Sequence, residues 1–333
     1  MKSVHKTSAL LLSSALCAAL LCGCGSKPSE RFTATGFYFD TVVTMSVYAR
    51  DDSVLDEALS LCADYEALLS KTVEGSDIWR INHACGEWTE VSPETASLLN
   101  QSISWAKATD GAFDVTIAPV MALWDFTAEA PSLPDESALM AAAELVDYTA
   151  LETDGNRVRL PEGMSIDLGG IAKGYISARV RDRLCELGVT EGLLNFGGNV
   201  VVIGGKPDGE PWKVGIQNPF ELTGTPLFAV AVTDSAVVTS GNYERFFELD
   251  GLRYHHIIDA RTGYPMQNGV AGVTVICPDA TEADALSTSC FLLGPEDGLE
   301  LIASLDGVEA VYIMSDGEVL TSPGLEGKLI YSN

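Results

Sequence analysis

The segment EADALSTSC (residues 282–290) places an acidic side chain, Asp284, four residues before a hydroxyl, Thr288, in a stretch with a helical pattern. At helical pitch, residues i and i+4 lie one above the other on the same face. A carboxylate and a hydroxyl are hard oxygen ligands that suit Mg²⁺, which usually keeps water and substrate phosphates as its other ligands. In the alternative interpretation, Asp284 lies in the first helical turn and compensates the helix dipole, while Thr288 hydrogen-bonds to a backbone carbonyl. Local spacing does not distinguish the two.

A second candidate segment, SIDLGGIAKGY (165–175), indicates a strand that ends in a turn with two glycines and continues into a helix. Glycines allow the backbone to approach a ligand closely, and free N–H groups at a helix start favour an anion. The GxxxxGK[ST] spacing of a Walker loop is absent. Lys173 would place a cation near a phosphate or, in the alternative, lie on the surface of an ordinary strand-to-helix turn.

The third candidate is the histidine pair in RYHHIIDARTGYP (253–265). His255 and His256 are adjacent on a predicted strand, so their side chains point to opposite faces and cannot chelate one metal together. A histidine near neutrality can take a proton from an attacking hydroxyl. The alternative is a half-buried pair without a chemical role.

The elements that must position these residues alternate irregularly between helix and strand. The patterns predict helices at 51–70, 92–111, 135–147, 171–187 and within 282–304, with Ser92 as an N-cap. They predict strands at 37–49, 192–203, 211–217, 226–233, 245–249, 253–258 and 270–276, and hairpins at 151–160 and around 315–317. Without strict βαβ alternation, the prediction is an α+β fold with mixed or antiparallel sheets, forming one two-lobed catalytic unit.

Composition narrows the function classes. The chain has 333 residues and a formal net charge of −27, so its surface repels polyphosphate backbones and nucleic acid is excluded as a partner. An anionic ligand would need a local cation or a helix N-terminus to offset that field. The five cysteines after Cys24 are widely spaced and contain no CxxC pair, so neither a disulfide framework nor a zinc site is predicted.

The N-terminal segment MKSVHKTSALLLSSALCAALLCGCGS has two lysines followed by a short apolar stretch, which is typical of an export signal. It ends in LCGC, which resembles the lipobox of bacterial lipoproteins and would make Cys24 the lipidated mature N-terminus. A plain secretory signal is the alternative. We therefore expect a signal peptide at 1–23, a lipidated cysteine and tether at 24–35, and a catalytic domain at 36–325. The implied location is the membrane, facing outside the cytoplasm.

Six segments together resemble one family, the ApbE family of FAD:protein FMN transferases. They occur in the order GAFDVTIAPVMALW (111–124), IDLGGIAKGY (166–175), LNFGGNVVVIG (194–204), SGNYERFF (240–247), HHIIDARTGYP (255–265) and DALSTSCFLLG (284–294). The likeness covers nearly the whole mature chain.

The resemblance implies a specific reaction. Members of the family bind FAD as substrate with Mg²⁺, cleave its pyrophosphate, transfer the FMN part to a Ser or Thr hydroxyl of a target protein, and release AMP. The implied protein partner is an exported or membrane redox flavoprotein. Two rivals use the same features: an FAD pyrophosphatase that passes FMN to water, and a surface lipoprotein that binds flavin without catalysis.

The metal ligands implied by the resemblance are Asp284 and Thr288 of the DAxxT element. A backbone carbonyl of the GGIA turn, from Gly170 or Ala172, would complete the protein's share of the ligands. Mg²⁺, a lysine and a helix start around the pyrophosphate would also resolve the charge problem of so acidic a protein.

Attack by a hydroxyl needs a base, and the resemblance further implies the flavin contacts. His256, just before IIDARTG, is predicted to deprotonate the incoming hydroxyl, with His255 as the alternative. The implied flavin contacts are Met45, Thr72, Ala112, Phe113, Asp114, Asp167, Lys173 and Ile258.

Overall fold

The computed structural model describes residues 29–128 and 130–331, so the predicted signal segment and Cys24 lie outside the described residues. The α-helices are α2 (Ser53–Leu69), α3 (Asp77–Asn82), α4 (Pro93–Ala108), α5 (Ala118–Met121), α6 (Glu136–Ala143), α7 (Ala172–Glu186), α8 (Ala280–Leu293) and α9 (Pro295–Ala303). The strands are β1 (Glu30–Tyr38), β2 (Thr41–Ala49), β3 (Thr89–Glu90), β4 (Glu152–Asp154), β5 (Arg157–Arg159), β6 (Glu191–Phe196), β7 (Asn199–Ile203), β8 (Trp212–Gln217), β9 (Pro226–Val232), β10 (Ala236–Gly241), β11 (Phe246–Leu249), β12 (Leu252–His255), β13 (Val270–Cys277), β14 (Glu309–Met314), β15 (Val319–Thr321) and β16 (Ile330–Tyr331).

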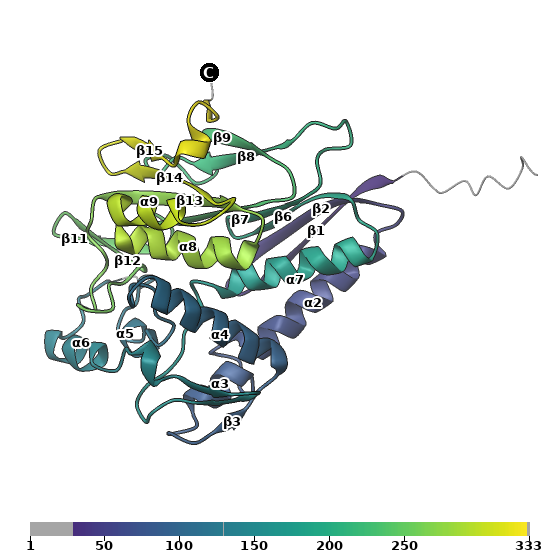
Figure 1. Ribbon diagram of the computed structural model, residues 1–333. Coiled ribbons are helices and arrows are strands. Elements are labelled where there is room, and N and C mark those ends of the chain that lie inside the picture. The colour runs from purple at the N-terminus through teal and green to yellow at the C-terminus, as the bar shows by residue number, and fades with distance from the viewer. Residues whose placement is uncertain (1–28, 129, 332–333) are drawn as a thin grey trace, which may run out of the picture.

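The main sheet has eight strands in the order β1-β2-β6-β7-β10-β13-β14-β15, and each neighbouring pair is antiparallel (Figure 1). Its central strand β13, VAGVTVIC, is buried at every residue because both faces of the sheet are covered there. The predicted α+β fold with antiparallel sheets is confirmed.

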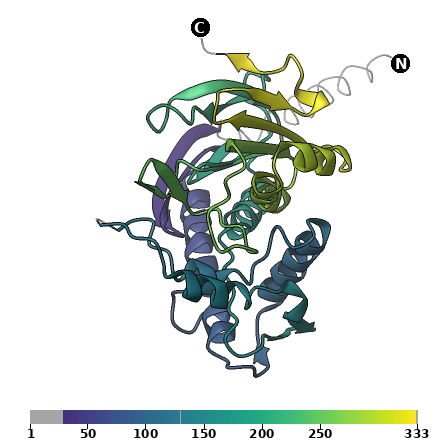
Figure 2. The ribbon, with the colours of Figure 1, turned by 90° about the vertical axis from the view of Figure 1, so that its left-hand side faces the viewer.

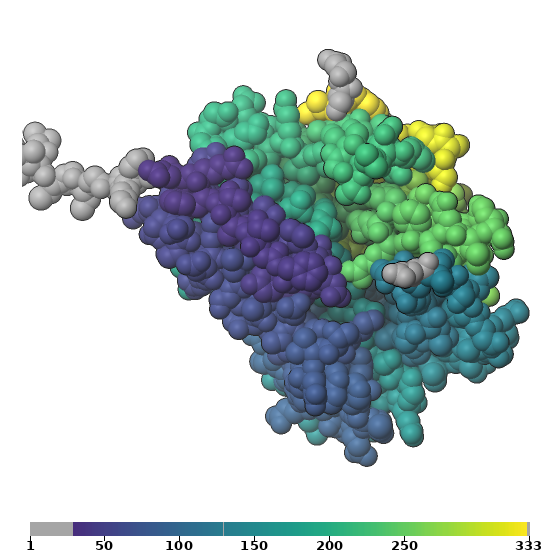
Figure 3. Space-filling view, turned by 180° about the vertical axis from the view of Figure 1, so that it is seen from behind, coloured from purple at the N-terminus to yellow at the C-terminus, as the bar shows by residue number. Residues whose placement is uncertain are grey.

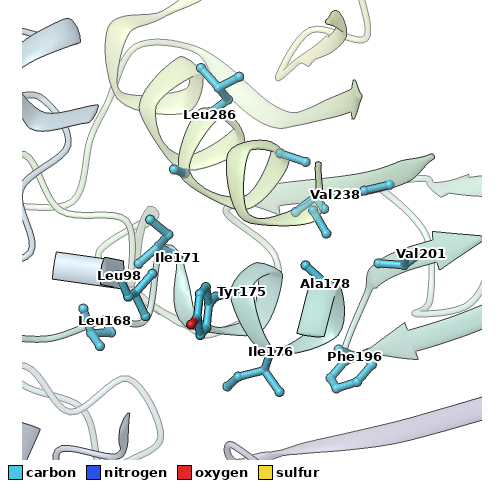
Figure 4. Close-up of a cluster of buried hydrophobic side chains, with 14 of the residues drawn as sticks. Leu98, Leu168, Ile171, Tyr175, Ile176, Ala178, Phe196, Val201, Val238 and Leu286 are labelled. Atoms are coloured by element: carbon cyan, nitrogen blue, oxygen red, sulfur yellow. The ribbon is translucent and has the colours of Figure 1, made fainter. Parts of the chain in front are cut away.

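Alternate residues of the central strands enter two different cores. Val201 and Val238 face the helices α7 and α8 (Figure 4), whereas their neighbours Val202 and Val237 face a second sheet of order β16-β9-β8. The period of two along each strand thus separates a helix side from a sheet side. Every deeply buried side chain on either side loses contact with water, which stabilises the fold by about 1.5–3 kcal/mol for each large apolar residue.

A lower lobe packs below the helix side and contains α3, α4, α5, α6 and a small sheet of order β3-β5-β4 (Figures 1 and 2). Its contact with the hairpin β11–β12 is aromatic: Trp124 stacks on Tyr254 with ring centroids 5.9 Å apart, and its Nε1 donates to the Gly263 carbonyl at 2.9 Å. Phe126 and Phe247 complete the stack. This cluster fixes the hairpin that carries His255.

The first strand prediction, 37–49, is wrong in its bounds because two strands occupy the region. The β1–β2 hairpin turns at Phe39 and Asp40, which have φ of 55° and 57° and carry none of the glycines that usually mark such a turn. Residues 30–35, assigned above to a tether, are strand residues paired with β2.

Two other predicted strands differ from the structure, and one strand was not predicted. The range 192–203 is divided into β6 and β7 by a turn at Gly197 and Gly198, whose φ values of 61° and 100° favour glycine. The strand β10 was missed altogether. The strand β12 ends at His255, so His256 follows the strand instead of lying within it.

The predicted helices 51–70, 92–111, 135–147 and 171–187 correspond to α2, α4, α6 and α7. Ser92 is the N-cap of α4 and accepts a hydrogen bond from the Thr95 N–H at 3.0 Å, as predicted. In the part of the chain that the structure describes, no helix combines the length and apolarity that a membrane span requires.

Candidate functional site

The candidate site lies where one end of the main sheet meets the starts of two helices. At this end β1 turns into β2, β6 turns into β7, β10 finishes and β13 begins. The turn before α7 and the first half of α8 lie beside it, because α7 packs on α8 and α8 packs on β10 and β13. Seen from behind, the surface is hollowed where the purple β1–β2 hairpin meets green and blue parts of the chain (Figure 3).

Asp284 is buried, with 3% of its surface exposed, and both of its carboxylate oxygens are hydrogen-bonded to other elements. Oδ1 accepts from Asn199 Nδ2 at 2.9 Å, and Oδ2 accepts from the Gly174 N–H at 2.8 Å. Because α8 begins at Ala280 with Asp279 as its N-cap, Asp284 does not lie in the first turn. The dipole interpretation of Asp284 is therefore wrong, and the carboxylate is held in one orientation by two fixed donors.

The packing of α7 on α8 depends on the absence of a side chain at Gly174. A Cβ there would lie 2.2 Å from the Ala280 carbonyl oxygen and 2.5 Å from Asp284 Cβ. The same residue supplies the N–H that holds Asp284, so close approach and carboxylate orientation have one cause. Figure 4 shows Ile171 and Tyr175 of this region packed beneath α8.

Thr288 lies one turn after Asp284 and is the only residue from Ala283 to Leu292 that is not buried. Its Oγ1 is 3.4 Å from Ser240 Oγ, and it makes no bond back to the preceding turn, unlike Ser289, which donates to the Ala285 carbonyl. A Cβ on Gly170 would lie 3.2 Å from Thr288 Oγ1. The structure therefore brings Asp284, Thr288 and the GGIA turn together, as predicted.

The oxygen atoms available at the site fit a hard cation that takes only a few of its ligands from the protein. It offers one carboxylate, one accessible hydroxyl and backbone carbonyls of the turn, which is the pattern of Mg²⁺ sites completed by phosphate and water. Among the described residues, no group of three or more His, Cys, Asp and Glu side chains is arranged to hold a metal. A site rich in protein ligands, such as a zinc site, is thus not formed by the described part of the chain.

The turn before α7 and the first turn of α7 carry two oppositely charged residues of the site, Asp167 and Lys173. Asp167 accepts from the Gly169 N–H at 2.8 Å and pairs with Lys71 Nζ at 2.6 Å. Lys71 is the neighbour of the exposed Thr72, so this ion pair ties the loop of Thr72 to the turn. Lys173, by contrast, takes part in no salt bridge among the described residues, and its Nζ lies 3.4 Å from the Gly169 carbonyl oxygen.

The two histidines have different environments. His255 is 2% exposed; its Nδ1 accepts from the Ile257 N–H at 3.3 Å, so its proton is on Nε2, which donates to the Met266 carbonyl at 3.0 Å. Burial lowers the pKa of His255 to about 4, so it is neutral and has no free nitrogen. His256 is only partly buried, and its Nδ1 has no hydrogen-bond partner in the described chain.

Burial keeps His256 in the neutral form. Desolvation, followed by the positive charges of Lys173 and Arg245, lowers the pKa of His256 to about 3. His256 therefore keeps one ring nitrogen without a partner, where His255 has none, but this nitrogen is enclosed by protein in the structure.

Two charged residues of this site received no role in the sequence analysis, although SGNYERFF contains them. Glu244 and Arg245 follow β10 and are exposed. Burial by surrounding protein raises the pKa of Glu244, while Lys173 and Arg245 lower it and Asp284 raises it. Because the charges of Lys173 and Asp284 act on Glu244, which also lies beside Gly198 of the β6–β7 turn, SGNYERFF belongs to the same site.

The residues matched to flavin contacts fall into accessible and inaccessible groups. Ala112, Thr72, Asp167 and Lys173 are at least partly exposed, whereas Phe113 and Ile258 are nearly buried at 3% and 5%. Phe113 nevertheless lies at the GGIA turn, since a Cβ on Gly170 would be 3.1 Å from its ring.

Two of the residues matched to flavin contacts, Met45 and Asp114, have a structural role in the fold. Met45 is 0% exposed within the helix-side core, so its side chain is not accessible to a ligand in this structure, and the direct contact predicted for it is wrong for the side chain. Asp114 accepts from Thr116 N–H and Oγ1 and from the Tyr148 N–H, so both of its oxygens are used to shape the loop, and burial raises its pKa.

Two surface cavities lie away from the candidate site. One of about 620 Å³ lies between α4 and the β4–β5 turn, and another of about 150 Å³ lies beside Asn82 and Met164. Neither is lined by any of the predicted site residues.

The comparisons with known proteins agree with this arrangement. Residues 39–312 match the ApbE family, and the chain belongs to that family. It is 32% identical over 332 residues to the FAD:protein FMN transferase of Treponema pallidum (strain Nichols), which covers 92% of each chain.

Solved structures show the same fold. The ApbE protein of Thermotoga maritima is 32% identical and superposes with a TM-score of 0.83 over 90% of this chain and 99% of its own. The flavin transferase ApbE of Vibrio cholerae, solved as a histidine-to-glycine mutant, is 27% identical with a TM-score of 0.79 over 90% of this chain and all of its own.

Proposed function

We propose that this protein is an FAD:protein FMN transferase that moves the FMN moiety of FAD onto a Ser or Thr hydroxyl of an acceptor protein and releases AMP. Family membership supports the reaction class. The observation that carries the proposal is the oriented pair Asp284 and Thr288, with the GGIA turn against Thr288 and a neutral His256 with a free nitrogen at the same end of the sheet.

Each side chain would have a separate role in this reaction. Asp284, Thr288 and a carbonyl of Gly170 or Ala172 would hold Mg²⁺. When bound, the ion neutralises pyrophosphate oxygens and lowers the cost of charge in the transition state. Lys173 and the N-terminus of α7 supply further positive potential for the phosphates. His256 removes the proton of the acceptor hydroxyl, whose oxygen attacks the phosphorus of the FMN half while the bond to AMP breaks.

The experiment is incubation of the purified protein with FAD, Mg²⁺ and an exported flavoprotein domain, followed by intact-mass analysis of the acceptor and chromatography of nucleotides. The expected result is an FMN-sized adduct on Thr or Ser and AMP in equal amount. Free FMN and AMP without an adduct would identify an FAD pyrophosphatase instead. Intact FAD after prolonged incubation would identify a binding protein, and full turnover in EDTA would contradict the metal role.

We also propose that Cys24 is lipidated and holds the enzyme on the membrane, outside the cytoplasm. The segment before Cys24 supports this, and β1 begins at Glu30, which leaves only residues 25–29 as a linker to the sheet. A Cys24→Ser variant is expected to move from the membrane fraction to the soluble fraction and to lose its acyl mass. Retention of the acyl mass would contradict lipidation at this residue.

A further inference from the structure

On one water-facing side of the β1–β2 hairpin, the paired side chains change from polar to apolar at the end nearest the site. Directly opposed residues of an antiparallel pair share a face, and the face repeats every second residue. The pairs on this face are Arg31–Tyr48, Thr33–Ser46, Thr35–Thr44 and Phe37–Val42. Two of them are hydroxyl pairs, with Oγ–Oγ distances of 2.6 Å and 3.5 Å. Only the last is entirely apolar.

That last pair, here called the apolar tip, has no packing role within the described residues. Phe37 is 67% exposed and Val42 is 54% exposed, and neither belongs to or packs against any of the three hydrophobic cores. The hairpin does not need apolar side chains on this face, since the preceding pairs are polar. Two adjacent large apolar side chains left in water are a feature of surfaces that bind another molecule.

The apolar tip lies at the rim of the candidate site. Val42 accepts a hydrogen bond from the Gly197 N–H at 3.2 Å, and a Cβ on Gly197 would lie 2.1 Å from Thr41 Oγ1. The next residue, Gly198, lies beside Glu244, whose Oε1 would be 3.9 Å from its Cβ. The β6–β7 turn therefore connects the apolar tip directly to Glu244, and Figure 3 shows the hairpin bordering the hollow.

The position of the apolar tip indicates which kind of molecule it binds. Val43 faces the helix-side core, so Val42 faces the opposite side of the sheet from α7 and α8, which hold Asp284 and Lys173. A dinucleotide held on the helix side is therefore separated from the tip by the sheet edge, whereas a protein substrate can span the rim. A bilayer is disfavoured as the partner of the apolar tip. The proposed membrane anchor precedes β1, which begins at Glu30, and Phe37 lies seven residues and roughly 23 Å further along the strand.

We propose that Phe37 and Val42 form the docking surface for the acceptor protein, and that they bind apolar residues next to the hydroxyl that receives FMN. The inference rests on the proposed transferase function and names how its second substrate is recognised. The net charge of −27 gives the enzyme no means of attracting an anionic partner by charge, whereas apolar contact does not depend on the sign of the partner's charge.

The test is the double variant Phe37→Thr, Val42→Thr, which copies the Thr35–Thr44 pair of the same face and places residues of high strand propensity at both positions. The matched control is Leu222→Thr, in the β8–β9 loop, because Leu222 is 84% exposed. Full-length enzymes are assayed with FAD, Mg²⁺ and an exported flavoprotein domain that the wild type labels, and KM for that domain, kcat, and the Kd for FAD are measured.

We expect KM for the acceptor to rise about tenfold or more, with kcat and the Kd for FAD unchanged. The variant loses two apolar contacts that are buried only in the complex with the acceptor, so docking alone is weakened. Leu222→Thr should match the wild type. An unchanged KM, or a parallel rise in the Kd for FAD, would overturn the proposal. If thermal unfolding shows the double variant to be unfolded, Val42→Thr alone decides by the same criteria. A wild type that labels no acceptor refutes the transferase function itself, which is a different outcome.

Discussion

The two sides of the candidate site are built in opposite ways. On the α8 side, Asp284 is buried and each carboxylate oxygen has a donor from a different element. On the side formed by the segments after β10 and β12, Glu244 and Arg245 are exposed and His256 Nδ1 has no partner within the described chain. The first arrangement fixes a geometry, whereas the second leaves two charged side chains exposed and one enclosed ring nitrogen unpaired. The contrast indicates that α8 supplies orientation, while the loops supply the groups that react.

The most severe way to break the oriented side is Asp284→Asn. Both groups that hold the carboxylate are N–H donors. The side-chain amide of the variant has one oxygen and one NH₂ group, so its NH₂ group would face one of these donors. We expect transfer to fall roughly a thousandfold, as several kcal/mol of charge stabilisation are lost. Single-turnover rates measure this. Near-normal transfer by the variant would mean that the carboxylate charge is not needed.

The reactive side is broken by His256→Ala. Loss of a positioned base typically costs at least about a hundredfold in rate. FAD affinity, by contrast, should be unchanged, because the variant keeps Asp284 and Lys173. Kinetics with FAD and acceptor, together with FAD titration, check both statements. The opposite pattern, in which His256→Ala is active and His255→Ala is folded but inactive, would assign the base to His255.

The packing of α7 on α8 can be tested by a substitution that adds one methyl group and removes no functional group. Gly174→Ala would bring a Cβ to 2.2 Å from the Ala280 carbonyl oxygen, so α7 and α8 must separate. We expect about 3 kcal/mol or more of lost unfolding free energy. Glu186→Ala, at an exposed position of the same helix, should stay within about 0.5 kcal/mol. Denaturant unfolding of both variants decides the matter, and equal stabilities would show that the helices can adjust freely.

The smallest effect concerns pH. His255 has a folded pKa of about 4, below its usual value of 6.5, so the unfolded chain binds the extra proton between these values and stability falls as the pH is lowered through them. The contribution of His255 should decrease by roughly 2 kcal/mol between pH 7 and pH 5. Unfolding free energies of the wild type and His255→Gln at both pH values test this. A variant with an equally steep dependence would show that His255 does not titrate on unfolding.

The i, i+4 spacing predicted that Asp284 and Thr288 share one face of a helix, which follows from helix geometry alone, whereas their role as ligands was implied by the family resemblance. The bounds of the first strand were wrong because the two-residue turn formed by Phe39 and Asp40 carries no glycine, so one apolar run hid two strands. Glu244 and Arg245 received no role because charged residues in a loop have no periodic signal; their position depends on contacts between distant segments.

Local rules thus determined which residues have helical spacing, which glycines allow close approach, and which segments are apolar enough to be buried. The sequence alone left two interpretations of Asp284 open, since a helix turn has the same spacing whether it ends in solvent or against another helix. The start of α8 at Ala280 ruled out the first-turn interpretation, and tertiary packing oriented the carboxylate by bringing Gly174 and Asn199, far away in the chain, within hydrogen-bonding distance. Packing also gave the two histidines different surroundings, because the number of unpaired ring nitrogens depends on the neighbours that the fold provides.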